Sequence, residues 1–288
     1  MILIDYSQVA ISNIAVQLAM SKDKNILSIP MVRHMILNSI RGYVHRFRND
    51  YPGEVVICVD GPDPWRRDIF EQYKAKRREG RNNDDKDWES VFGLIHTIKE
   101  EIRDNFPYKV VQLDKVEADD IIAVICKKNR EEKILIVSGD KDFQQLQKYP
   151  NVFQYSPTQK KFVETDSPQE YIYEHILRGD TSDGIPNFLS PDDTFVNKIK
   201  QKPVSKKKLS GWIDSLMRGN DPQDFCNEYH YRNYQRNQRL IDFDYIPDDI
   251  ESDIYKEYEK VTVSSRSKLL PYMIKNDLRE LIGKIEEF

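Results

Sequence analysis

The stretch DKVEADDIIAVICKKNREEKILIVSGDKD, residues 114–142, decides the fold of this chain of 288 residues. It combines an apolar helical run at residues 121–126 with ILIV at residues 134–137, which has the composition of a buried strand. Acidic side chains stand just before the helix and just after the strand, namely Glu117, Asp119, Asp120, Asp140 and Asp142. A helix joined to a buried strand in this way is typical of α/β proteins.

The same arrangement, an apolar strand that ends in aspartate, occurs at two other places. MILID at residues 1–5 ends in Asp5, and VVICVD at residues 55–60 ends in Asp60. The carboxyl ends of parallel strands lie along one edge of a sheet, and ligands bind there. We therefore expect Asp5, Asp60 and Asp140 to meet at that edge.

Strands alternate with helices through the first part of the chain. We expect strands at residues 2–5, 55–59, 109–113 and 134–137, and helices that begin at Ser7, at Ser28 with Pro30, near residue 87, after Glu117 and at Ser167 with Pro168. This order predicts an α/β fold, with a mostly parallel central sheet and helices on both faces. A smaller, mainly α-helical C-terminal region follows, with a helix from Asp221 and two short packed helices after about residue 247.

Composition excludes several classes of protein. Cys58, Cys126 and Cys226 show no C-x-x-C spacing, so we expect reduced thiols and neither a zinc site nor a disulfide. The N-terminus lacks a basic and then apolar leader, and each apolar stretch is shorter than a membrane span of about 18 residues. We therefore expect a soluble, cytoplasmic protein without a membrane partner. The net charge of −4 does not favour nucleic acid globally, so local basic runs matter more.

A group of five or six carboxylates at one edge needs cations or bound protons. Two carboxylates about 4 Å apart repel by roughly 4 kcal/mol at an effective dielectric constant near 20. Because the candidate ligands are all carboxylate oxygens, the set favours Mg²⁺ or Mn²⁺ over Zn²⁺. It is large enough for two ions, which can hold the attacking and leaving oxygens of a phosphodiester. Each aspartate taken singly is more typical of a strand-end turn or a helix cap than of a functional site, and only their convergence favours a metal site.

A further acidic pair follows the helix that Gly179 ends. Asp180 and Asp183 lie three residues apart in RGDTSDGIP, a spacing that can direct both carboxylates to one place. The alternative is a turn rich in aspartate that binds no ligand.

Two basic segments fit a phosphate substrate. Residues 65–81, WRRDIFEQYKAKRREGR, hold seven Arg and Lys against three acids. Within them, Lys74 and Arg77 share one face of the expected helix and can neutralise a phosphate, and Trp65 or Tyr73 can stack on an unpaired base. Arg66 and Arg67 complete the candidate nucleic-acid contacts of this segment, which we expect to form a flexible cover. A solvated charged helix is the alternative.

The second basic segment, residues 196–212, contains six lysines and no acid. These are Lys198, Lys200, Lys202, Lys206, Lys207 and Lys208. They suit the backbone of duplex nucleic acid, where each phosphate contact adds affinity that depends on salt but not on sequence. A solvated linker is the alternative.

These motifs, in this order, resemble the flap endonuclease and 5′ nuclease family over nearly the whole chain. The matching motifs are MILIDYS, the Asp60 strand, WRRD with YKAKR, VEADD, SGDKDFQQL and GDTSDGIP, and the tail IDFDYIPDDI resembles the phage members. The resemblance implies 5′ to 3′ exonuclease and flap endonuclease activity that removes RNA primers and adjacent DNA during lagging-strand synthesis. It also implies a catalytic domain at residues 1–183, with a basic arch at about 65–90, and a helical duplex-binding domain at residues 184–288.

The resemblance assigns roles residue by residue. Asp5, Asp60, Glu117, Asp119 and Asp120 match the positions around a first Mg²⁺ ion, and Asp140, Asp142, Asp180 and Asp183 match those around a second, with Mn²⁺ as a substitute. Asp119 and Asp140, with the arch cations Lys74 and Arg77, are the implied catalytic residues. Implied partners are DNA and RNA·DNA duplexes with 5′ ends, flaps or forks, a single-strand DNA-binding protein and a sliding clamp, for which the C-terminal IEEF is a candidate. We expect a monomer in the cytoplasm of an infected bacterial host.

The sequence differs from the family at one place, and other functions were also considered. NFLSPDDTFVNKIKQK, residues 187–202, lacks the glycines of the family's helical hairpin, which puts its monovalent-ion site in doubt. A phosphatase with Asp-x-Asp after its first strand, or a dinucleotide-binding protein with a Gly-rich turn there, does not fit Asp5-Tyr6-Ser7. A PIN-type single-strand or RNA-processing nuclease and a non-catalytic DNA-binding replication factor remain alternatives. Metal dependence separates the catalytic from the non-catalytic function.

Overall fold

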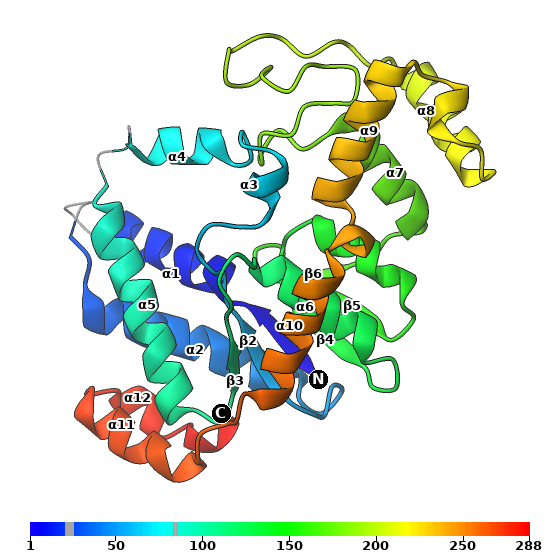
Figure 1. Cartoon of the computed structure of the whole chain (residues 1–288). Coiled ribbons are helices and arrows are strands. Elements are labelled where there is room, and N and C mark those ends of the chain that lie inside the picture. The colour runs from blue at the N-terminus through cyan, green and yellow to red at the C-terminus, as the bar shows by residue number, and fades with distance from the viewer. Residues whose placement is uncertain (21–25, 83, 85) are drawn as a thin grey trace.

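A six-stranded sheet forms the centre of the molecule (Figure 1). The computed structural model describes residues 1–20, 26–82, 84 and 86–288. The strand order is β3-β2-β1-β4-β5-β6, and every neighbouring pair is parallel except β5 and β6. The strands are β1 (Ile2–Asp5), β2 (Val55–Cys58), β3 (Lys109–Val111), β4 (Ile134–Val137), β5 (Val152–Ser156) and β6 (Lys161–Val163). The predicted α/β fold with a mostly parallel sheet is confirmed.

Helices cover both faces of this sheet because the buried strands are apolar on both sides. Ile2 and Ile4 of β1 pack into one hydrophobic cluster and Leu3 into another. The first cluster contains α1 (Tyr6–Met20), α2 (Ile29–Phe47) and α5 (Trp88–Asn105), and the second contains α6 (Ala118–Lys128) and α10 (Asp248–Lys260). In the part of the chain that the structure describes, no helix has the length and apolarity of a membrane span.

The last part of the chain returns to the sheet. Ile254 and Tyr258 of α10 pack with α6, whereas α11 (Leu269–Lys275), α12 (Arg279–Ile282) and Phe288 pack with α2 and α5. The expectation of two short helices after residue 247 was therefore incomplete. Phe288 is 1% exposed and its ring centroid lies 5.3 Å from that of Phe106, so the IEEF segment is docked and does not form a free tail. A domain boundary at residue 183 stays a prediction.

A third hydrophobic cluster joins α7 (Pro168–Arg178), α8 (Lys206–Met217) and α9 (Glu228–Ile241). Phe70 and Tyr73 also belong to it, and they come from the basic segment near α3 (Arg66–Ile69) and α4 (Ala75–Asn82). Figure 1 shows α4 extending from α3 above the sheet, on the same side as the loop before α8. The cluster thus anchors one end of α4 to the C-terminal half.

Several boundaries differ from those expected. Strands β5 and β6 were not predicted, and β3 ends at Val111 instead of residue 113. Helix α1 begins at Tyr6, because the Asp5 carboxylate accepts a hydrogen bond from the Gln8 backbone N–H at 3.1 Å. Ser7 therefore lies inside the helix rather than at its cap.

The predicted helix from Asp221 was also wrong. Asp221 and Pro222 open only a short 3₁₀ turn, Pro222–Asp224, and Asn227 is the cap of α9.

Candidate active site

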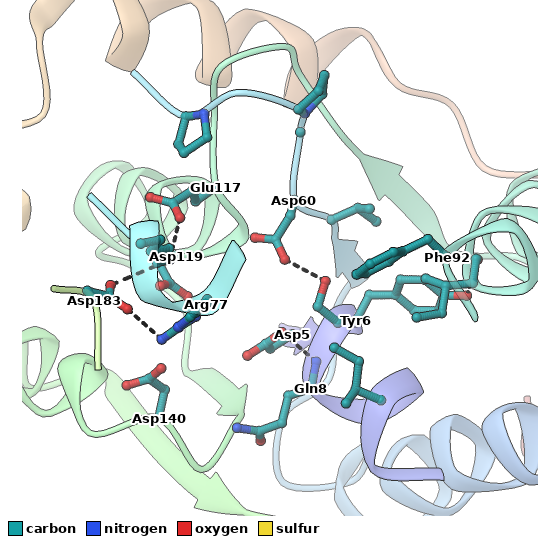
Figure 2. A pocket seen from close by; sticks show the side chains of 18 of the residues that line it. Asp5, Tyr6, Gln8, Asp60, Arg77, Phe92, Glu117, Asp119, Asp140 and Asp183 are labelled. Carbon is teal, nitrogen blue, oxygen red and sulfur yellow. Dashed lines mark hydrogen bonds and ion pairs between the residues drawn. The ribbon is translucent and has the colours of Figure 1, made fainter. Parts of the chain in front are cut away.

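A cavity of about 710 Å³ opens at the carboxyl ends of the parallel strands. Strand β1 ends at Asp5, and Asp60 and Asp140 lie in the turns just after β2 and β4, as the sequence predicts. Figure 2 shows Asp5, Asp60, Asp119, Asp140 and Asp183 around this space. Eight predicted acidic residues line the cavity, namely Asp5, Asp60, Glu117, Asp119, Asp140, Asp142, Asp180 and Asp183.

The carboxylates at the first two strands are held by nearby polar groups. The Asp5 carboxylate accepts a hydrogen bond from the Ser138 hydroxyl at 3.0 Å, in addition to its bond from Gln8. Asp60 accepts hydrogen bonds from the Ser7 hydroxyl at 2.5 Å and from the Ala118 backbone N–H at 2.9 Å. These bonds join the ends of β1, β2, β4 and α6, so the fold fixes the orientation of both carboxylates before any ligand binds.

A histidine lies among the second group of carboxylates. His175 Nδ1 lies 3.4 Å from an oxygen of Asp142, and Nε2 lies 3.6 Å from an oxygen of Asp180. One ligand atom from each of these residues lies within 4.8 Å of the others. His175 was not among the residues predicted from the sequence. Its place in the last turn of a helix that runs directly into GDTSD was the available signal.

Several carboxylates of the cavity have raised pKa values, because they are buried and repel one another. Burial, with Asp60 next, raises the pKa of Asp5 to about 7. Burial also raises the pKa of Asp142 to about 7, although His175 acts in the opposite direction. The pKa of Asp119 is raised well above its usual range by burial and then by Asp140 and Asp5. Hard oxygen donors that repel one another in this way fit divalent cations.

Two other carboxylates of the cavity, Glu117 and Asp180, have lowered pKa values because of neighbouring groups. Burial would raise the pKa of Asp180, but the nearby His175 and hydrogen bonds from Ser182 lower it below its usual range. Likewise, Lys74 and Arg66 outweigh burial and lower the pKa of Glu117. Nearby groups therefore stabilise the negative charge of Glu117 and Asp180, whereas at Asp5 and Asp119 they do not offset burial and repulsion.

Two cations approach the acidic cavity from the basic segment. Lys74 Nζ lies 2.5 Å from Glu117 Oε1 and 3.5 Å from Asp183 Oδ2. Arg77 lies 2.5 Å from Asp183 Oδ1, and its side chain is 43% exposed. The two residues do not share a helix face as expected, because α4 begins at Ala75 and Lys74 has a φ of 55°. They nevertheless converge on Asp183.

Comparison with known proteins identifies the family. The profile of the 5′-3′ exonuclease N-terminal, resolvase-like domain matches residues 2–175, and that of the T4 RNase H C-terminal domain matches residues 166–288. Ribonuclease H of Enterobacteria phage T4 is 38% identical over 99% of this chain and 95% of its own length. The chain belongs to the 5′-3′ exonuclease family. It is accordingly a nuclease, an enzyme that hydrolyses phosphodiester bonds.

Two solved structures from bacteriophage T5 share the fold of this chain. The bacteriophage T5 protein co-crystallised with metal ions has a TM-score of 0.62 at 15% identity, over 90% of this chain and 98% of its own. The T5 flap endonuclease in a pseudo-enzyme-product complex with DNA and metal ions has a TM-score of 0.61 at 15% identity, over 90% and 97%. The expected resemblance to a phage 5′ nuclease is confirmed.

One expected metal ligand of this 5′ nuclease, Asp120, lies outside the cavity. It is fully buried, and its carboxylate accepts hydrogen bonds from Arg66 at 2.7 and 2.9 Å and from Trp65 Nε1 at 3.0 Å. Arg66 is itself 3% exposed and also donates to Glu117 at 3.0 Å and to the Leu240 carbonyl at 2.8 Å. The expectations of a metal ligand at Asp120 and a nucleic-acid contact at Arg66 were therefore wrong. The pair joins α3, α6 and α9 instead.

The two aromatic residues proposed to stack on a base are also buried. Trp65 is 4% exposed and Tyr73 is 3% exposed. The Tyr73 hydroxyl lies 2.9 Å from Glu117 Oε2 and 3.1 Å from Asp183 Oδ2. In this nuclease Trp65 donates a hydrogen bond to Asp120 and Tyr73 donates to Glu117, and the expected contact of Tyr73 with nucleic acid was wrong.

The remaining basic candidates are accessible. Arg67 lines the cavity and forms an ion pair with Asp63 at 2.8 Å. The lysines of residues 198–208 are exposed and lie outside the lining of the cavity, although Lys198 Nζ approaches Glu79 of α4 to 3.9 Å. Part of the expected cover, residues 83 and 85, falls outside the described residues.

Proposed function

We propose that this chain is a divalent-metal-dependent 5′ to 3′ exonuclease and flap endonuclease that acts on RNA·DNA hybrids and on DNA with 5′ ends, flaps or forks. The observation that carries the proposal is the cavity at the strand ends, where the eight predicted carboxylates lie together with cations from the basic segment, of which Lys74 and Arg77 contact them directly. The phage T4 relative is a ribonuclease H, and the T5 structural relative is a flap endonuclease. Removal of RNA primers and adjacent DNA in replication is the process that this activity would serve.

The residues at the cavity fit two magnesium ions. Asp5, Asp60, Glu117 and Asp119 would hold the first, and Asp140, Asp142, Asp180 and Asp183 the second, in part through water. Manganese would substitute, since the donors are mainly carboxylates. When bound, the ions would supply Lewis acidity for phosphodiester oxygens and lower the pKa of a coordinated water.

The chain's own residues would place and neutralise the phosphate. Lys74 forms an ion pair with Glu117 and Arg77 forms one with Asp183, and both cations line the cavity. A phosphate that enters between Lys74 and Arg77 would replace these carboxylates as their anionic partner. Tyr73, hydrogen-bonded to both acids, would hold them in position during this exchange. The phosphate to be hydrolysed would then lie between these positive side chains and the carboxylates that would hold the metal ions.

The duplex would lie against the lysines before and within α8. Lys206, Lys207 and Lys208 form the first turn of this helix and are exposed. Three positive charges at a helix N-terminus oppose the macrodipole, so they do not serve helix stability. Their place fits contact with a phosphate backbone, together with Lys198 and Lys200.

Replacement of Lys206, Lys207 and Lys208 by alanine is expected to weaken duplex binding and to lower its salt dependence by up to about three counterions. The measurement is the slope of log K against log salt concentration, from fluorescence anisotropy. Replacement of Lys256 and Lys260 by alanine on α10, also exposed, is the control and should leave the slope unchanged. A wild-type slope in the triple variant would assign these lysines to solvated surface.

Further partners stay predictions. We infer contacts with a single-strand DNA-binding protein and a sliding clamp, a monomeric state, and action in the cytoplasm of the bacterial host, from the family alone. The docked position of Phe288 means that a clamp would have to contact another segment or displace this one.

The experiment that tests the proposed function compares substrates with magnesium and with chelator. A 5′-labelled RNA·DNA hybrid and a 5′ flap should both be cut in magnesium and remain intact in chelator. Cleavage of single strands alone would favour the PIN-type alternative. Binding without cleavage under either condition would favour the non-catalytic replication factor.

A further inference from the structure

One wall of the acidic cavity is apolar. Phe92 of α5 lines the cavity and is 39% exposed. Ile11 of α1, 38% exposed, and Ile95 of α5 line it as well. Figure 2 places Phe92 on the side of Asp60 and Tyr6, with Arg77 and Asp183 toward the other side. Phe92, Ile11 and Ile95 together form an apolar wall that borders the carboxylates, and apolar groups gathered at a cavity are typical of ligand-binding sites.

The ring of Phe92 is held in place by its neighbours. The centroid of the half-buried Trp88 ring lies 5.7 Å away at an interplanar angle of 29°, and Trp88 packs against the hydrophobic core. The guanidinium of Arg81 lies 5.0 Å from the Phe92 centroid and 5.7 Å from that of Trp88. A fixed aromatic surface with an adjacent cation is the arrangement that binds unpaired bases in nucleic-acid-binding proteins.

The neighbouring groups match the parts of a nucleotide. A nucleotide joins a charged phosphate to a base with two apolar faces. Arg77, Arg78 and Arg81 line the same cavity as Phe92 and can receive phosphates, while the carboxylates border the aromatic wall through Asp60. The helix that carries Phe92 is tied to the start of α1, because the Tyr6 hydroxyl donates a hydrogen bond to the Ile95 carbonyl at 2.8 Å. This bond connects the wall to the helix that directly follows Asp5.

We propose that Phe92, supported by Trp88 and Arg81, is a stacking site for an unpaired base of the 5′ single strand beside the phosphate to be cut. The inference rests on the proposed function and deepens it. Stacking on a ring face is tolerant of sequence, so the site would recognise the presence of an unpaired base and not its identity. It takes the role that Trp65 and Tyr73, both buried, cannot have.

The test is equilibrium binding of a 5′ flap in chelator, where no cleavage occurs, with 2-aminopurine at the unpaired position next to the duplex. Phe92→Ala is expected to weaken flap binding by about tenfold and to relieve the quenching of 2-aminopurine, because base stacking on an aromatic ring is lost. Phe92→Tyr keeps an aromatic face and should restore both. Phe153→Ala is the matched control, since Phe153 is 37% exposed on β5 and is not part of the cavity lining.

An abasic flap separates stacking from a structural effect. Wild type should bind an abasic flap about as weakly as Phe92→Ala binds the normal flap, and the two changes together should add no further loss. An equal loss of affinity for normal and abasic flaps, or for a blunt duplex, would overturn the proposal. A wild-type protein that binds flaps but never cuts them in magnesium would contradict the proposed function instead and leave the stacking site standing.

Discussion

Asp119→Asn is expected to reduce the rate of 5′-flap cleavage by about a thousandfold, while the affinity for uncut substrate stays within about threefold of wild type. Asp119 lies near both groups of carboxylates, since Asp140 and Asp5 both raise its pKa. The amide keeps the size of the side chain but removes a charged ligand. The measurement is single-turnover cleavage in magnesium beside fluorescence anisotropy in chelator.

Asp140→Asn should give the same separation of cleavage from binding. Asp253→Asn is the matched control, because Asp253 is 67% exposed on α10 and pairs only with Lys256 among its ion-pair partners in the described chain. Cleavage by Asp119→Asn at the wild-type rate would mean that this carboxylate takes no part in the reaction.

Arg66→Met should lower the free energy of unfolding by about 3–5 kcal/mol, because it leaves Asp120 buried without its positive partner. Both oxygens of Asp120 accept hydrogen bonds from Arg66, and the carboxylate is fully buried. Glu117 would lose its hydrogen bond from Arg66 at the same time. Urea unfolding followed by circular dichroism measures the change.

Two further variants define the cause of this loss. Arg67→Met removes the neighbouring arginine, whose ion pair with Asp63 is solvent-exposed, and should cost roughly 0.5 kcal/mol or less. Adding Asp120→Leu to Arg66→Met should recover most of the lost stability, since no unpaired charge then remains at that position. A loss below about 1 kcal/mol in Arg66→Met would show that the buried pair is not important for folding.

Much of the fold and of the site was predictable from the sequence. Short continuous apolar runs are typical of strands buried on both faces, and the parallel order brings the aspartates at or just after their ends, Asp5, Asp60 and Asp140, together. The strands β5 and β6 escaped prediction. VFQYS alternates weakly, and the short KFV pairs only through its antiparallel contact with β5.

The errors at the site have one physical cause, which is that local sequence does not give the direction of a side chain. Asp119 and Asp120 are adjacent in α6, and successive residues on a helix point about 100° apart, so only one faces the cavity. Arg66 and Tyr73 lie in a basic segment typical of exposed helices, yet α6, α7 and α9 cover them. Only the tertiary contacts distinguish these two from the accessible Arg67 and Arg77.

Isothermal titration of the wild-type protein with magnesium and with manganese, in two buffers of different ionisation enthalpy, tests the convergence of carboxylates on a metal site most directly. The pKa values of Asp5 and Asp142 are raised to about 7, so near neutral pH both are partly protonated, and cation binding must release these protons. We expect saturable uptake with proton release, weakening as the pH falls below about 7 and reduced in Asp119→Asn. Absence of uptake, or uptake unchanged in Asp119→Asn and independent of pH, would contradict it.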